Sequence, residues 1–69
     1  MGFGWVTLGA NPYALVEIDG QRVGTTPIVR HRLAAGRHEV VFIAPDSGAV
    51  RRRVPFSIEA DETREIVVP

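Results

Sequence analysis

The chain has 69 residues, of which 45% are hydrophobic; it has no cysteine, and its eight arginines balance eight acidic residues. This length allows a single domain that buries about 60% of its unfolded surface, and without cysteine it has neither disulfides nor thiolate metal sites. Zero net charge argues against a non-specific nucleic-acid binder, and no apolar run is long enough to span a membrane. We therefore expect residues 1–69 to be one domain of a longer protein, with no cofactor, no nucleic-acid partner and no membrane insertion by this segment.

The pattern along the chain predicts β-strands and no helix. No window of eleven residues keeps a helical apolar stripe, and four internal prolines would break one. Alternating apolar and polar residues instead predict strands at 5–8, 14–19, 21–23, 28–33, 37–44, 49–58 and 63–68. Strands at this spacing are typical of a sandwich, so we expect an all-β fold, a small antiparallel β-sandwich of about seven short strands. The expected core residues are Val6, Leu8, Val16, Ile18, Ile28, Leu33, Val40, Phe42, Val54, Phe56, Ile58, Ile66 and Val68.

Turn residues mark the points where these strands reverse. Asp19-Gly20 is a tight-turn signal because glycine accepts a positive φ, and the Asp19 carboxylate is expected to accept a hydrogen bond from a backbone N–H two residues on. A second turn is predicted from Gly24 to Pro27, with threonine hydroxyls satisfying backbone groups. The residues assigned to structural turns are Asp19, Gly20, Gly24, Thr25, Thr26, Pro27 and Gly36. The alternative is a loop that binds a carbohydrate or a peptide.

The predicted strand at 49–58 is long and irregular. Strict alternation places Arg52 on its apolar face, where the side chain would have to reach water at the rim. Pro55 lacks a backbone donor, so this strand is expected at a sheet edge or bulged there. Arg51 and Arg53 share the opposite face and are tentative binding residues for an acidic partner. Arg30, Arg32 and Arg37 would add to such a patch, and ion pairs with surface glutamates are the alternative.

Isolated aromatic and histidine side chains supply the other binding candidates. Trp5 and Tyr13 are tentative binding residues because their rings could stack on a sugar, although such rings also cap small cores. His31 and His38 would leave two zinc ligands unfilled, and His38 has the parity of the core residues of its strand. No nucleophile or pair of acids has a catalytic context. The sequence therefore predicts no enzyme, with no catalytic, cofactor-binding or metal-binding residue.

A family resemblance rests on residues 11–40. Asn11-Pro12, a strand that ends in Ile-Asp-Gly, the run Val-Gly-Thr-Thr-Pro and the spacing Leu-x-x-Gly-x-His-x-Val resemble the PEGA domain, and the resemblance extends from Trp5 to Val68. Where the family has Pro-Glu-Gly-Ala, this chain has Pro-Tyr-Ala-Leu and one residue fewer before Asp19-Gly20. This short form resembles the C-terminal PEGA domains of large bacterial proteins, notably myxobacterial serine/threonine kinases.

The resemblance implies a β-sandwich module attached to kinases, surface-layer proteins and other envelope proteins, without catalytic activity. The family's recurring residues correspond here to Pro12, Val16, Asp19, Gly20, Gly24, Thr25, Pro27, Gly36 and Val40. All have structural explanations, so no binding residue is carried over. We expect an accessory module that mediates protein–protein interaction or assembly of a larger bacterial protein, with glycan or cell-envelope binding as the alternative. Its location would follow its parent, in the cytoplasm for a soluble kinase and in the envelope for a parent with a signal or transmembrane segment.

Overall fold

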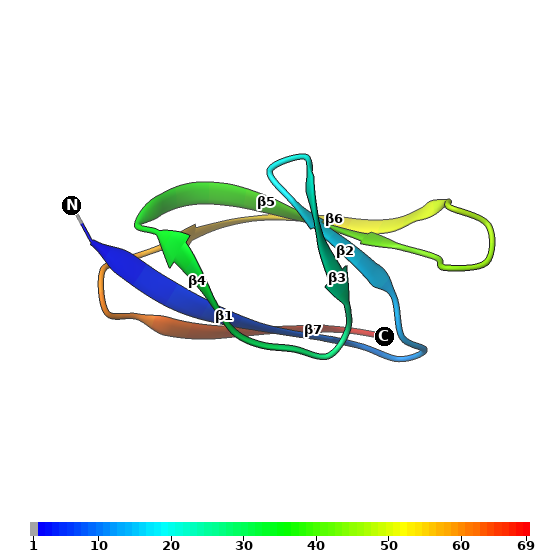
Figure 1. The fold of residues 1–69 in the computed structure, drawn as a ribbon, viewed down its shortest axis with the longest axis horizontal. Coiled ribbons are helices and arrows are strands. Elements are labelled where there is room, and N and C mark those ends of the chain that lie inside the picture. The colour runs from blue at the N-terminus through cyan, green and yellow to red at the C-terminus, as the bar shows by residue number, and fades with distance from the viewer. Residues whose placement is uncertain (1) are drawn as a thin grey trace.

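A computed structural model describes residues 2–69 and leaves Met1, the first residue of the expected domain, outside the described part. Seven strands make up this part of the chain, in agreement with the predicted all-β fold (Figure 1). They are β1 (Phe3–Ala10), β2 (Leu15–Ile18), β3 (Gln21–Thr25), β4 (Ile28–Ala34), β5 (Gly36–Ile43), β6 (Val50–Ile58) and β7 (Thr63–Val68). Within residues 2–69, no helix is long and apolar enough to cross a membrane.

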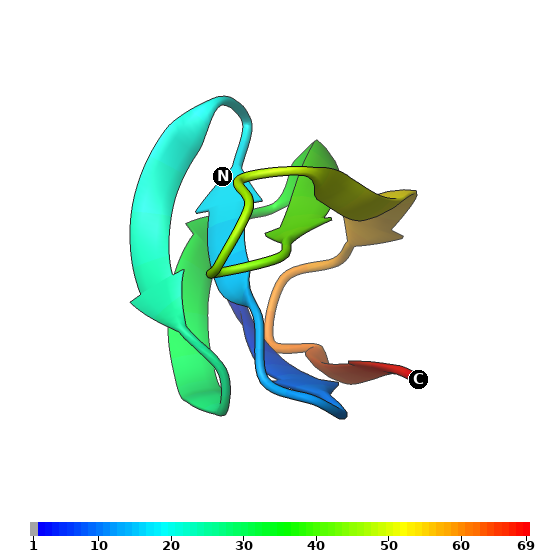
Figure 2. The same cartoon turned by 90° about the vertical axis from the view of Figure 1, so that its right-hand side faces the viewer.

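The strands form two sheets that lie as two layers of an elongated sandwich (Figures 1 and 2). The three-stranded sheet has the order β4-β1-β7, and the four-stranded sheet has the order β3-β2-β5-β6. The chain crosses between the sheets after β1, β3, β4 and β6, whereas β2–β3 and β5–β6 are hairpins within one sheet. The molecule measures 38 × 18 × 16 Å. Four strands are therefore edges: β3 and β6 in one sheet, β4 and β7 in the other.

One strand pair departs from the expected antiparallel arrangement. β7 runs parallel to β1, from Trp5 opposite Thr63 to Ala10 opposite Val68. The chain enters β7 at the same end of the sandwich at which it enters β1, and the Trp5 amide donates to the Glu62 carbonyl there at 2.8 Å. The reason is topological: the turn after β6 returns the chain to the other layer beside the beginning of β1. All the other pairs are antiparallel.

The predicted core is confirmed. Nine of the thirteen expected residues are buried, and the other four (Ile28, Leu33, Val54 and Ile66) pack against them while partly exposed. Phe42 is fully buried and is the largest side chain at the centre. Ala14 also belongs to the buried cluster, as its parity with Val16 and Ile18 indicates. With no cysteine in the chain, burial of these apolar side chains is the main source of stability.

The first hairpin is closed by two residues. Asp19 and Gly20 have φ angles of 53° and 83°, the pattern of the two-residue turns that match strand twist. Further on, Gly24 and Thr25 extend β3 instead of turning, so the reversal is confined to Thr26 and Pro27. Thr26 is buried; its Oγ1 accepts from the Ala14 amide at 3.0 Å, and its own amide donates to the Ala14 carbonyl at 2.9 Å. Both threonine contacts thus join the chain to the start of β2.

Candidate functional site

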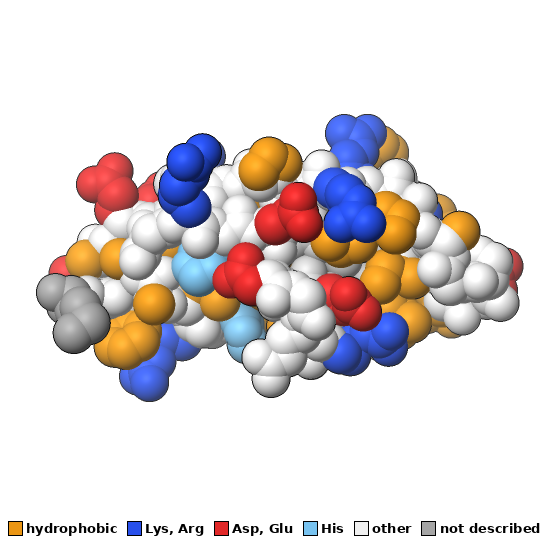
Figure 3. Space-filling view, turned by 90° about the horizontal axis from the view of Figure 1, so that it is seen from above, with side chains coloured by type: hydrophobic (Ala, Val, Ile, Leu, Met, Phe, Trp, Pro, Cys, Tyr) orange, Lys and Arg blue, Asp and Glu red, His pale blue; other side chains and the backbone are white. Residues whose placement is uncertain are grey.

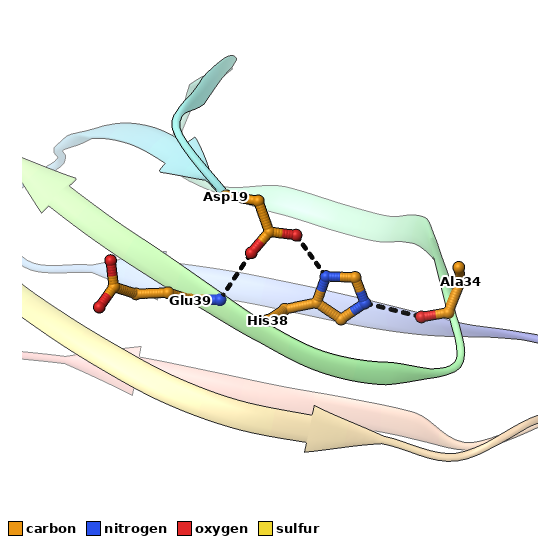
Figure 4. Close-up of polar contacts among 4 residues, drawn as sticks. All are labelled: Asp19, Ala34, His38 and Glu39. Carbon is orange, nitrogen blue, oxygen red and sulfur yellow. Dashed lines mark hydrogen bonds and ion pairs between the residues drawn. The ribbon is translucent and has the colours of Figure 1, made fainter.

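A polar network joins the first hairpin turn to β5 and to the end of β4 (Figure 4). Asp19 Oδ2 lies 2.5 Å from His38 Nδ1, and His38 Nε2 lies 2.7 Å from the Ala34 carbonyl oxygen. Asp19 Oδ1 accepts from the Glu39 amide at 2.9 Å. The carboxylate therefore bonds to β5 across the sheet. The sequence had led us to expect a bond to a backbone N–H of its own turn instead. The network ties the four-stranded sheet to β4 of the other sheet.

The two ionisable groups of this network shift each other's proton affinity. The hydrogen bond to His38 lowers the pKa of Asp19; burial opposes this, but the Glu39 amide and the charge of His38 add to the lowering, so this pKa lies below its usual 3.8. Burial lowers the pKa of His38, but the Ala34 carbonyl and Asp19 raise it by more, so this pKa lies above its usual 6.5. The folded protein therefore favours the ion pair.

The geometry also fixes the protonation of His38. Both of its partners, a carboxylate and a carbonyl, can only accept hydrogen bonds, so both ring nitrogens must carry a proton for both bonds to form. An imidazolium in this position has no free nitrogen with which to act as a general base. Ser57 lies near His38 at the rim of a surface pocket, but no hydrogen bond joins them among those of residues 2–69. The network is therefore a structural clamp. His38 lies at the edge of the core, as expected, and the centre of its ring is 5.8 Å from that of Phe56.

Arg51 and Arg53 do not share a face. The pairing of β5 with β6 shifts register between Phe42 opposite Arg52 and Ile43 opposite Val50, so Arg51 is the additional residue of a β-bulge. The bulge inverts the alternation and resolves the anomaly at Arg52, which is exposed. Arg51 turns inward at the end of the sandwich and donates to three backbone carbonyls, those of Pro12 (2.8 Å), Tyr13 (3.3 Å) and Pro69 (3.0 Å).

Arg53, by contrast, lies on the outer face of the four-stranded sheet, where its Nη1 is 3.5 Å from Glu39 Oε1. Arg22 makes a similar contact with Glu17, at 3.4 Å. From above, acidic and basic side chains are interspersed around apolar ones (Figure 3). This face therefore carries balanced, solvated ion pairs and no concentrated basic patch.

Trp5 and Tyr13 are far apart. Trp5 lies on the outer face of the three-stranded sheet, near the beginning of β1, and Arg30 Cζ is 5.3 Å from the centre of its ring. Tyr13 follows the end of β1 and is 58% exposed, in a surface pocket of about 250 Å³ that Pro12, Pro45 and Arg51 also line. The two rings are separated by most of the length of β1, about 17 Å from Trp5 to its last residue. They do not form a common stacking platform.

The edge strands differ in how they are protected against pairing with another chain. β3 has a bulge at Val23, and β4 has a bulge at which Arg30 adopts a φ of 52°. β6 has a bulge at Arg51 and a proline at position 55, and its Ser57 carbonyl accepts from Arg64 at 2.7 Å. β7 has no bulge and no proline. Charged side chains also protect edges, and β7 carries Arg64 and Glu65, but of the four edges β7 is the one whose row of free backbone groups no bulge or proline interrupts.

The backbone of β7 presents alternate residues to its free side. The Glu62 and Val68 carbonyls accept from the amides of Trp5 and Asn11, which shows that even-numbered residues turn toward β1. In a parallel ladder the intervening residues turn both of their backbone groups the other way. The N–H and C=O groups of Thr63, Glu65 and Val67 therefore face the free edge. Val67 is also 65% exposed.

Sequence reasoning did not foresee the main polar contacts. Asp19 and His38 were each singled out, but the pairing of β2 with β5 that joins them cannot be read from local pattern. Arg51 was placed on the wrong face, although the anomaly of Arg52 on an apolar face was a signal that the register had to shift. In residues 2–69, no group of three or more histidine and acidic side chains has the arrangement of a metal site.

Comparison with known proteins gives one result. The family model described as the PEGA domain matches residues 3–68, which is nearly the whole chain. No curated protein and no solved structure matches the chain. The match covers both sheets, so the family assignment rests on the whole sandwich and not on one motif.

Proposed function

The chain belongs to the PEGA domain family, and from this premise we propose that it is a non-catalytic module that joins a larger bacterial protein to a protein partner. The observation that carries the proposal is the β7 edge. Its three outward residues, Thr63, Glu65 and Val67, offer unpaired backbone donors and acceptors in a regular row. An extended segment of a partner would add to this row as a further strand of the sheet.

The contrast among the four edges supports this assignment. Bulges or a proline interrupt the other three, as expected where pairing with another chain is to be avoided. β7 has six residues, about the mean length of a strand, and Val67 gives an incoming strand an apolar neighbour. The lack of a free base at His38 is consistent with a module that binds and does not catalyse.

Glycan binding was the alternative, and it rested on Trp5 and Tyr13. The two rings lie at different places along the sandwich, and an arginine covers Trp5. We therefore favour a protein partner. Sedimentation of the domain with purified peptidoglycan or polysaccharide, lost in Trp5→Ala, would favour the alternative.

The wider context is part of the proposal. The short form of the domain favours a parent such as a bacterial serine/threonine kinase or an envelope protein, which the module would dock onto its partner or assembly. A kinase parent without a membrane segment would place it in the cytoplasm, and a parent with a signal or transmembrane segment would place it in the envelope. The sequence of the parent protein tests this directly.

Two substitutions at one position test the strand-addition mechanism. Glu65→Pro removes a backbone donor on the free side of β7 and leaves the hydrogen bonds to β1 in place, since proline is tolerated at such edge positions. Glu65→Ala removes the same side chain and keeps the donor. We expect a partner captured by the parent protein to bind the alanine variant and to lose binding to the proline variant, with equal thermal stability of both as the control. Equal binding of the two variants would refute strand addition at β7.

A further inference from the structure

A second surface lies on the outer face of the three-stranded sheet. Alternation along β1 turns Phe3 and Trp5 outward, and Phe3 is 47% exposed. Two arginines of the neighbouring β4 lie over these rings: Arg32 Cζ is 4.5 Å from the Phe3 ring centre, and Arg30 Cζ is 5.3 Å from that of Trp5. We call these four residues the arginine–aromatic face.

Within the part of the chain that the structure describes, these two arginines have no acidic partner. The ion pairs of residues 2–69 involve Arg22, Arg53, Arg64 and His38, and none includes Arg30 or Arg32. Arg37, Arg51 and Arg52 also make no ion pair within residues 2–69, but of these five arginines only Arg30 and Arg32 lie over aromatic rings. Contact with an aromatic ring restrains a guanidinium group while leaving N–H groups that do not face the ring available. The arginine–aromatic face therefore presents two guanidinium groups that are held in place and have no neutralising carboxylate.

The backbone of Arg30 gives an independent observation. Its φ of 52° is uncommon for a residue with a side chain, and its amide donates to Thr7 Oγ1 at 3.2 Å. The bulge at this point lets Ile28 return to the core while Arg30 stays on the outer face with Arg32. Glycine would form the same bulge with less strain. Strained non-glycine residues tend to occur at functional sites, where the side chain is needed.

We propose that the arginine–aromatic face binds an extended acidic segment of a protein, with carboxylates on alternate residues. Phe3 and Trp5, the rings beneath the two guanidinium groups, are two residues apart in the regular part of β1, so they repeat at about 6.7 Å. Alternate side chains of an extended peptide have the same repeat. Each guanidinium fork matches one carboxylate in a bidentate pair. The occupant follows from this charge complementarity and spacing.

A long polyanion fits this face less well. The domain has no net charge, and Glu65 lies on the same face of the sheet, opposite Thr7 in the pairing of β1 with β7. Two positive charges bordered by a carboxylate suit a short acidic segment better than a nucleic acid, which needs an extended basic surface. The arginine–aromatic face is separate from the proposed strand-addition edge, because β4 and β7 are opposite edges of the sheet. This inference does not depend on the proposed function.

The probe is a pair of synthetic peptides of equal composition. One alternates glutamate with threonine over ten residues, and the other has its five glutamates in a block. Trp5 is the only tryptophan and lies beneath Arg30, so its fluorescence reports binding. We expect the alternating peptide to change the emission and to bind more tightly than the block peptide. Loss of one bidentate pair weakens binding by about tenfold, so Arg30→Gln with Arg32→Gln should weaken it at least that much.

Two variants separate this inference from general electrostatics. Arg22→Gln with Arg53→Gln removes the same charge from the other sheet and should change binding less than twofold. Arg30→Lys with Arg32→Lys keeps the charge but loses the forks, and should weaken binding several-fold. Equal binding of the two peptides, full binding by the lysine variant, or an equal loss in the control variant would overturn the proposal. Tighter binding of a uronate oligosaccharide or a single-stranded oligonucleotide of equal charge would overturn the choice of occupant.

Discussion

The Asp19–His38 clamp predicts a specific dependence of stability on pH. The pKa of His38 is raised in the folded state, so between its unfolded and folded pKa values the folded protein binds a proton that the unfolded chain has released. The stabilisation is complete below pH 6.5 and is lost as the pH rises through the folded pKa. Asp19 has the opposite pH dependence. Its contribution to stability is complete above pH 3.8 and is lost as the pH falls through its lowered pKa. Together the two groups favour a mildly acidic optimum.

The size of the effect follows from the contacts. Deprotonation leaves His38 with one N–H for two acceptors, so one of its charge-assisted hydrogen bonds is lost. Such a bond contributes about 1.5–3 kcal/mol. The Asp19 side chain is 48% exposed, so water replaces part of the interaction and reduces the expected loss to about 1 kcal/mol.

Urea denaturation from pH 5 to pH 9 measures this loss. We expect the wild-type free energy of unfolding to fall by about 1 kcal/mol across this range relative to that of His38→Gln, which lacks the titrating group. A His38→Gln variant with the same pH dependence as the wild type would refute the clamp.

Three substitutions test the packing and the closure of the sandwich. Gly4→Ala should lower the free energy of unfolding by about 1–3 kcal/mol, because a Cβ there would lie 2.8 Å from the carbonyl oxygens of Glu59 and Glu62. Chemical denaturation checks this against Gly9→Ala, a position that has space for a Cβ. Equal stability of the two variants would contradict the prediction. Phe42→Ala should cost about 3–5 kcal/mol in the same assay, and a loss under about 1 kcal/mol would show that Phe42 is not central to the core. Arg51→Gln should lower the free energy of unfolding by about 1–2 kcal/mol. The neighbouring Arg52→Gln should change it by less than about 0.5 kcal/mol. Similar values for the two variants would mean that the three carbonyl contacts of Arg51 contribute nothing to stability.

Much of the fold was accessible from the sequence, because a half-buried strand alternates apolar and polar residues. All seven strands and every expected core residue were found in this way. The tight turn at Asp19-Gly20 could also be predicted, since few residue pairs accept a positive φ in succession. These features depend on local sequence alone.

The remaining features depend on which strands become neighbours. Asp19 meets His38 only because β2 pairs with β5, and Phe3 meets Arg32 only because β1 pairs with β4. A bulge caused the misplacement of Arg51, because one additional residue inverts the alternation on which face assignments rest. That inversion moved Arg51 from the outer face to the closed end of the sandwich. The parallel pairing of β7 likewise follows from the path of the chain between layers.

The central claim is that β7 is an open edge that accepts a partner strand, and amide hydrogen exchange along β7 tests it most directly. In the free protein we expect the amides of Thr63, Glu65 and Val67 to exchange quickly and those of Arg64 and Ile66 to be protected by β1. Addition of the partner should protect the first three and leave the others unchanged. Protection of Glu65 and Val67 in the free protein, or no change in their exchange when the partner binds, would contradict the account.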